Sequence, residues 1–472
     1  MLRPVTKFIA DSCRTQLGLA SVAVVTLCAV GILTLVGLHL TGAELSPYVG
    51  ILTFMALPAG FVLGLVGVAV ARVRSRRAAR RGELLRPAFD LSNPRDRERL
   101  VAVAALSVVN LVIVALVSYQ GVHFMDSTGF CGKVCHQVME PEFTAYQNSP
   151  HARVACTGCH IGPGASWFVK SKLSGTRQVF AVAFNTYERP IPTPIENLRP
   201  ARETCEQCHW PQKFHGDRVK VLSRYAEDEA NTESKTVLLL KVGGGSLESG
   251  FGNGIHWHVT SDIDYRATPD RKTIHWIGVE NADGTRREYW SESAKTNRDS
   301  ILALPARRMD CIDCHNRPTH AYERPAEALD AKLHGGQIAR DLPWVKQQGL
   351  VLLQAAWPSK EAALAALDDS LLAFYRRDYP EIAASRARDI EAAAVAIGEI
   401  YARNIFPKMH VTWGTYPNLI GHKDDGGCYR CHDDMHATDE GQTISQDCST
   451  CHNLLALEEV NPPIVQALYG GQ

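Results

Sequence analysis

The feature that most constrains this chain is a repeated pair of cysteines with a histidine directly behind the second one. Five pairs share one spacing, and they are Cys156-Thr-Gly-Cys159-His160, Cys205-Glu-Gln-Cys208-His209, Cys311-Ile-Asp-Cys314-His315, Cys428-Tyr-Arg-Cys431-His432 and Cys448-Ser-Thr-Cys451-His452. A sixth, Cys131-Gly-Lys-Val-Cys135-His136, has one extra residue between its cysteines. Twelve of the 14 cysteines in the 472 residues belong to these motifs, so they are not scattered core thiols.

This pattern is typical of covalent haem attachment. The two thiols add to the vinyl groups of the porphyrin, and the adjacent histidine becomes the proximal ligand of the iron. Zinc ribbons, redox-active cysteine pairs and structural disulfides also use paired cysteines, but none of them requires a histidine behind every pair. We therefore predict six haems c, with the proximal ligands His136, His160, His209, His315, His432 and His452. The extra residue of the first motif must bulge, and Cys13 and Cys28 are interpreted as ordinary thiols.

We expect the second axial ligands to be mostly histidines. Ten histidines stand outside the motifs and the predicted membrane segments, and seven of them are our candidates: His151, His215, His256, His258, His320, His422 and His436. His215, His320 and His436 each follow closely behind a motif, although a lone histidine is more often a surface or core residue. Met139, three residues after His136, is an alternative ligand of the first iron, and a thioether ligand raises the potential of a haem.

Three uncharged runs, at residues 17–40, 49–70 and 100–122, are long enough to cross a membrane. A helix that rises about 1.5 Å per residue spans a hydrocarbon core of roughly 30 Å with some 20 residues. A buried helix of a soluble protein is the alternative, and the length of the runs argues against it. The first run is too long for the apolar core of a signal peptide and further spans follow it, so we expect it to remain as an anchor.

Charge predicts the orientation of these spans. The loop between the first two spans carries only Glu44, whereas the second span is followed by Arg72, Arg74, Arg76, Arg77, Arg80, Arg81 and Arg86. The positive-inside rule then places the N-terminus and the arginine-rich loop in the cytoplasm of a bacterium and everything after the third inner-membrane span in the periplasm. Such a loop could also simply contact lipid headgroups, which is compatible with this orientation.

The formal net charge of zero argues against a nucleic-acid partner. It hides an asymmetry, because residues 1–120 carry 13 basic and 6 acidic side chains and the remainder is correspondingly acidic. An acidic periplasmic part favours basic redox partners.

The fold class we expect is a mainly α, membrane-anchored multihaem cytochrome with a loop-rich, haem-packed outer part. We divide it into a membrane anchor (1–122), a haem domain with three motifs (123–216), a small antiparallel β meander (217–300) and a helical domain with three more motifs (301–472). In the meander the run IHWHV is interpreted as a strand, which would direct His256 and His258 to one side. Leucines at helical spacing, with a break at Pro380, predict a helical pair within 341–406.

Three further patterns lie between residues 131 and 209, namely Cys135-His-x-x-Met139, Ser149-Pro-His151, and the second motif followed by Gly162-Pro163 and by Lys170 or Lys172. With them the chain resembles the NapC/NirT/NrfH family of membrane-anchored quinol dehydrogenases. The resemblance implies that Ser149-Pro-His151 supplies a distal ligand, that Met139 ligates the first haem and that a lysine lines the quinol pocket.

The chain departs from the short form of this family, which has one anchor and four haems. Its three spans and six motifs look more similar to the larger inner-membrane cytochromes of the ImcH type, which metal-respiring bacteria use to send electrons outward. The acidic group that the short form places near its quinol site has no clear counterpart, since no Asp or Glu occurs between Glu142 and Glu188.

The resemblance implies oxidation of menaquinol or ubiquinol beside the first haems, with electrons passing to periplasmic c-type cytochromes or a terminal reductase in anaerobic or extracellular respiration. Loss of two protons with two electrons requires a base, for which Lys170 and Lys172 are our catalytic candidates. Three alternatives stay open. The chain could be a relay subunit without its own quinol site, it could run in the quinone-reducing direction, or it could be a terminal reductase with an open iron position.

Overall fold

The computed structural model describes residues 15–40, 56–81, 93–134, 136–195, 198–244, 254–281, 283–422 and 426–470. The chain divides into two compact units, Met1–Met125 and Asp126–Gln472. Cys13, Cys135, the side chain of His136 and residues 49–55 of the second predicted span lie outside the described residues.

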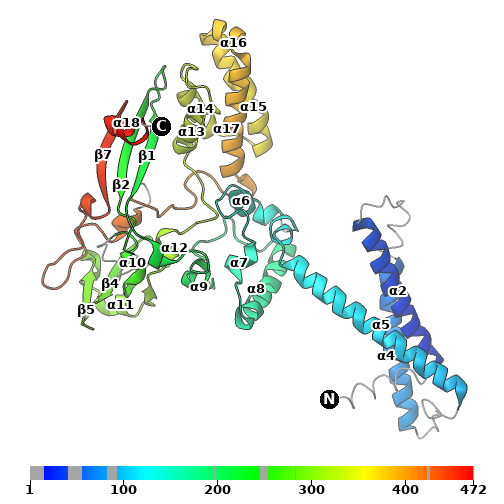
Figure 1. Cartoon of the computed structure of the whole chain (residues 1–472). Coiled ribbons are helices and arrows are strands. Elements are labelled where there is room, and N and C mark those ends of the chain that lie inside the picture. Colours follow the sequence, from blue (N-terminus) through cyan, green and yellow to red (C-terminus); the bar gives the residue numbers. More distant parts are fainter. Residues whose placement is uncertain are drawn as a thin grey trace. The chain divides into compact units, whose positions relative to one another are not determined.

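Three long helices make up the described part of the first unit (Figure 1), and they are α2 (Gln16–Leu40), α4 (Leu57–Arg80) and α5 (Pro94–Met125). By length and composition each could cross a membrane, over Gln16–Leu35, Leu57–Arg80 and Ala104–Met125. The three predicted spans are therefore present as helices. The second one continues past residue 70 to Arg80, because alanine and arginine are both good helix formers.

Small residues bring α2 and α4 close together. A Cβ atom at Gly64 of α4 would lie 2.7 Å from Cγ2 of Val25 on α2, which leaves room for glycine only. Asn110 of α5 donates a hydrogen bond to the hydroxyl of Thr26 on α2 over 2.7 Å. Close glycine contacts and interhelical polar bonds are the usual means of packing helices in membranes.

The second unit begins with helices that carry the first motifs or lie between and after them. They are η2 (Phe130–Val134), α6 (His136–Gln147), α7 (Cys156–His160), α8 (Ala165–Ala183), α9 (Ala201–Cys205) and η3 (Pro211–Lys213). The later motifs lie in α12 (Cys311–Cys314), η6 (Gly427–Arg430) and η7 (Cys448–Thr450). Each standard motif therefore lies in, or starts at the end of, a single helical turn.

The described residues of this unit form two antiparallel sheets. One has the order β1-β2-β7, from Arg218–Tyr225, Glu233–Leu240 and His452–Glu459. The other has the order β5-β4-β3-β6, from Arg286–Trp290, Ile274–Glu280, Ile263–Ala267 and Arg307–Arg308. The single meander that we predicted is therefore wrong, because the strands divide between two sheets and the first sheet takes its third strand from the C-terminal region.

The predicted strand IHWHV is also wrong. It forms the short helix α10 (Trp257–Thr260), and His256 is its N-cap residue. The amide of Trp257 donates to the carbonyl of Gly254 (2.9 Å), and that of Ser261 donates to Trp257 (3.0 Å), so local turns replace the sheet pairing. Five residues are too few to distinguish the two periodicities.

A helical subdomain packs beside the first sheet (Figure 1), and its helices are α13 (Pro325–His334), α14 (Val345–Gln354), α15 (Lys360–Asp378), α16 (Pro380–Ser385) and α17 (Ala387–Asn404). The predicted helical region is confirmed, with Leu367 and Leu371 buried and a new helix starting at Pro380. Tyr225 of β1 joins the same core, which fixes the sheet against these helices. The shorter helices are α11 (Arg298–Leu302), η4 (Glu292–Ala294), η5 (Pro407–Met409) and α18 (Pro463–Tyr469).

Candidate haem sites and the lysine–aspartate pair

The first motif absorbs its extra residue in a π-helical turn. Helix η2 covers Phe130–Val134, which includes Cys131 and the residues between the two cysteines. A π-helical turn holds one residue more than an α-helical turn, so the expected bulge takes this form. Gly132 is buried there, and a Cβ atom at this position would overlap the ring of Phe143 on α6.

Each of the five standard proximal histidines lies opposite one other histidine. The ring centroids are 6.2 Å apart for His160 and His320, 6.0 Å for His209 and His151, 6.5 Å for His315 and His256, 5.7 Å for His432 and His258, and 6.0 Å for His452 and His422. Two imidazoles on opposite sides of one metal ion, with metal–nitrogen bonds of about 2 Å and ring centres roughly 1 Å behind the nitrogens, have centroids about 6 Å apart. The spacing of all five pairs therefore fits an iron between the rings.

Hydrogen bonds orient four of these rings. Their Nδ1 atoms face backbone carbonyls, in the contacts His256 to Val242 (2.6 Å), His258 to Ile255 (2.9 Å), His320 to Glu142 (2.9 Å) and His432 to Ser445 (2.8 Å). A carbonyl oxygen only accepts, so Nδ1 carries the hydrogen and Nε2 keeps the lone pair that a metal requires.

Burial also keeps several of these imidazoles neutral. It is the main cause that lowers the pKa of His160, His258, His315 and His320. A metal ligand must be deprotonated at the binding nitrogen, so a lowered pKa favours ligation at neutral pH.

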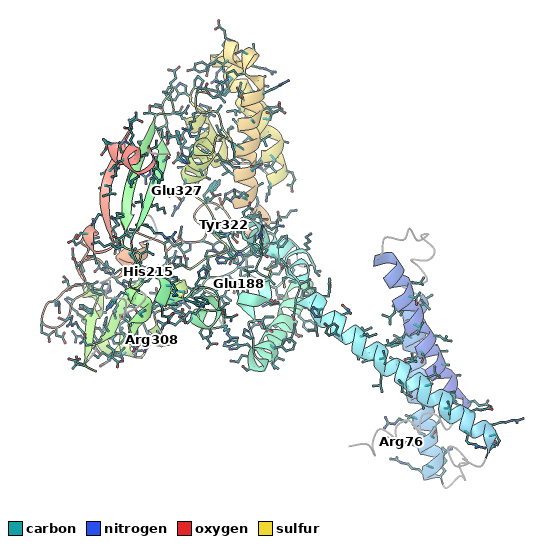
Figure 2. The ribbon with its side chains drawn as sticks, viewed as in Figure 1. Arg76, Glu188, His215, Arg308, Tyr322 and Glu327 are labelled. Carbon is teal, nitrogen blue, oxygen red and sulfur yellow. The ribbon has the colours of Figure 1, made fainter. Side chains whose placement is uncertain are left out.

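Two candidate distal histidines are not brought to a proximal ring. His215, labelled in Figure 2, is exposed and faces no motif histidine among the described side chains. In His436, Nδ1 contacts the carboxylate of Asp433 (2.9 Å) and Nε2 contacts the carbonyl of Ile274 (3.0 Å), so neither nitrogen is left for iron. Closeness to a motif in sequence was a poor guide, because the chain turns these two side chains away. Met139 lies partly buried on α6, three residues after His136.

Thiols of successive motifs are neighbours. A hydrogen bond from Cys131 lowers the pKa of Cys156 to about 6, and one with Cys205 raises the pKa of Cys311. Burial is the main cause that raises the pKa of three other thiols, and a nearby thiol is the second cause. Cys205 is that neighbour for Cys159, and Cys428 is the neighbour for both Cys314, whose pKa rises to about 11, and Cys451. The motifs therefore lie in a row that follows their order in the sequence.

The described cysteines form no disulfides. Among the described residues there is also no group of three or more His, Cys, Asp or Glu side chains around one point.

The two lysines that we predicted at the quinol site differ in their surroundings on α8. The ammonium of Lys172 donates to the carboxylate of Asp126 over 2.8 Å and lies 4.8 Å from the ring centre of Phe168. Lys170 is exposed and lies 4.4 Å from the ring centre of Trp167. No acidic residue occurs between Glu142 and Glu188, and the carboxylate beside Lys172 comes instead from Asp126, which precedes the first motif.

Asp126 and the following Ser127 connect the two nearest motifs. The carbonyl of Asp126 accepts a hydrogen bond from the hydroxyl of Thr157 inside the second motif (3.5 Å), and the amide of Cys131 bonds to Ser127 (3.2 Å). The Lys172 and Asp126 side chains are 31% and 34% exposed, so both can exchange protons with the surroundings.

Comparison with known proteins identifies the family of this chain. Residues 93–192 match the model of the NapC/NirT cytochrome c family, N-terminal region. The chain is 45% identical over 430 residues to the cytochrome c-type protein ImcH of Geobacter sulfurreducens, which covers 90% of this chain and 84% of that protein. This chain belongs to the NapC/NirT cytochrome c family. No solved structure matches it.

As a member of the NapC/NirT cytochrome c family, the chain is a membrane cytochrome that takes part in electron transfer and binds haem c covalently. The residues described above suit that cofactor, because paired thiols would hold the porphyrin and paired imidazoles would bind the iron.

Proposed function

We propose that this cytochrome oxidises menaquinol or ubiquinol at the periplasmic face of the bacterial inner membrane and relays the electrons to periplasmic acceptors through six haems c. The observation that carries the proposal is the row of five histidine pairs, in motif order, in a chain with three candidate membrane spans. When bound, the haems would supply one-electron redox centres.

Five of the haems would each be held by one standard motif and one histidine pair. In motif order the distal ligands are His320, His151, His256, His258 and His422. The first haem would be held by Cys131 and Cys135, with ligands from His136 and Met139. A thioether ligand gives that haem a higher potential than a second imidazole would.

Asp126 and Lys172 form the proposed proton-accepting pair of the quinol site. Oxidation of a quinol releases two electrons and two protons, and a carboxylate within reach can take a proton as the electrons leave. The Lys172 ammonium lies 2.8 Å from this carboxylate and would hold it in position for the quinol. Partial exposure lets Asp126 pass each proton on to water.

The orientation of the chain is part of the proposal. The basic residues of α4 and the following loop favour a cytoplasmic location for that end of the helix, which leaves the haem motifs in the periplasm. The acidic outer part would attract basic soluble cytochromes or a terminal reductase as electron acceptors.

Rapid mixing of the purified, full-length protein with a reduced menaquinol analogue tests the quinol reaction. We expect the analogue to reduce the haems, and we expect Asp126→Asn and Lys172→Met to slow the reduction by about 100-fold or more. Arg177→Gln, at an exposed position of the same helix, is the matched control and should reduce at the parent rate.

Dithionite should reduce every variant fully, which separates a damaged quinol site from a lost haem. If dithionite reduces the parent protein and the quinol does not, the quinol site is refuted, and the chain is then a relay subunit. Reduction of the quinone by the prereduced protein, without the forward reaction, would favour the reverse direction.

A further inference from the structure

A buried carboxylate connects the helix of the first motif with a ligand of the second haem. Glu142 lies on α6, three residues after Met139, and its side chain is 12% exposed. The Nδ1 atom of His320 lies 2.9 Å from the Glu142 carbonyl and 3.2 Å from its carboxylate. His320 is the ring opposite His160, so Glu142 contacts the proposed distal ligand of the second haem.

Arg317 balances the charge of this carboxylate. Its Nη2 atom donates to both carboxylate oxygens of Glu142, over 2.7 and 2.8 Å, and its Nε atom donates to the carbonyl of His320 over 2.7 Å. The guanidinium is held against aromatic rings, 3.9 Å from the ring centre of Tyr416 and 5.2 Å from that of Tyr322, which Figure 2 labels. Only 12% of its side chain is exposed, so water screens this ion pair weakly.

We propose that Glu142 is a positioning residue that fixes the orientation of His320 and, together with Arg317, sets the potential of the second haem. An acceptor at Nδ1 makes the imidazole a stronger donor to iron, which stabilises the ferric state. The neighbouring guanidinium has the opposite effect. The inference rests on the proposed function, since it takes His160 and His320 as the ligands of one haem.

The same helix would thereby serve the first two haems. α6 begins at His136, carries Met139 and then presents Glu142 to His320. Glu140 on this helix instead pairs with Lys360 of α15, over 3.3 Å. The two carboxylates therefore differ in what they contact, which provides an internal control.

The test is an equilibrium redox titration of the full-length protein with chemical reductants, followed by the electron paramagnetic resonance signals of the low-spin haems. His320→Met identifies the signal of the second haem by changing its ligand. Glu142→Gln keeps the backbone acceptor for His320 and leaves the Arg317 charge unbalanced, so we expect that potential to rise. Arg317→Gln leaves the carboxylate unbalanced, so we expect the potential to fall.

Glu140→Gln should leave the second haem unchanged. Shifts of the same sign in Glu142→Gln and Arg317→Gln, or no shift beyond that of Glu140→Gln, would overturn the proposal. If Glu142→Gln does not accumulate, the comparison of Arg317→Gln with Glu140→Gln decides by itself. No quinol is used, so a failed quinol reaction and a failed proposal for Glu142 are distinguishable.

Discussion

Two histidines that stand two positions apart should serve two different irons. The His256 ring lies 6.5 Å from that of His315, and the His258 ring lies 5.7 Å from that of His432. Replacement of either by alanine removes one axial ligand and leaves the thioether bonds of that haem in place, because the cysteines are unchanged. The haem should therefore stay attached and become high-spin.

The size of the effect follows from the pairing. With six haems per chain, His256→Ala and His258→Ala should each convert about one-sixth of the ferric iron to the high-spin form, and the double variant should convert about one-third. The measurement is spin quantitation by electron paramagnetic resonance, normalised to the haem content of the same sample. His215→Ala is the control, since that exposed side chain faces no proximal ring among the side chains that the structure describes.

The reasoning would be refuted by a double variant that converts no more iron than one single variant, because both rings would then serve the same haem. It would also be refuted if His215→Ala produced as much high-spin iron as either substitution.

Four further substitutions test the packing of the first two motifs and of the helical subdomain. Gly132→Ala should cost one haem, because the new methyl group displaces the phenylalanine ring behind the first motif. Gly158→Ala in the second motif meets only ordinary contacts and should keep all haems. Intact mass measures the number of haems in both variants. The Lys346 ammonium lies 2.5 Å from the carboxylate of Asp330, and Lys346→Met leaves that carboxylate without its buried partner. The free energy of local opening of the helical subdomain, measured by hydrogen exchange, should fall by about 3 kcal/mol. Asn231→Ala removes two buried bonds to backbone carbonyls and one from a backbone amide, and it should cost roughly 2 kcal/mol in the same experiment.

Local patterns were sufficient to predict several elements of this fold. The three apolar runs form helices of membrane-spanning length, because length and the absence of charge alone determine that property. The helices after residue 341 also follow from local periodicity, as the buried Leu367 and Leu371 show. The bulge in the first motif could be expected from the count of residues, but its form as a π-helix could not.

Long-range pairings could not be predicted in the same way. His320 stands just behind the third standard motif, yet its ring faces His160 of the first standard motif. Strand β7 begins at His452 of the last motif and pairs with β2, more than 200 residues earlier in the chain. Asp126, the partner of Lys172, precedes the first motif and therefore lies outside the stretch between Glu142 and Glu188 in which no acidic residue occurs. In each case the tertiary fold, and not the local sequence, decides which side chains meet.

The most direct test of the account is a redox titration of the membrane-extracted protein combined with a count of haems per chain. The account predicts six covalently bound haems, five with the low potentials of bis-histidine iron and one with the higher potential of a methionine-ligated first haem. A count of five or fewer haems, or high-spin iron at any of the five histidine pairs in the parent protein, would contradict it.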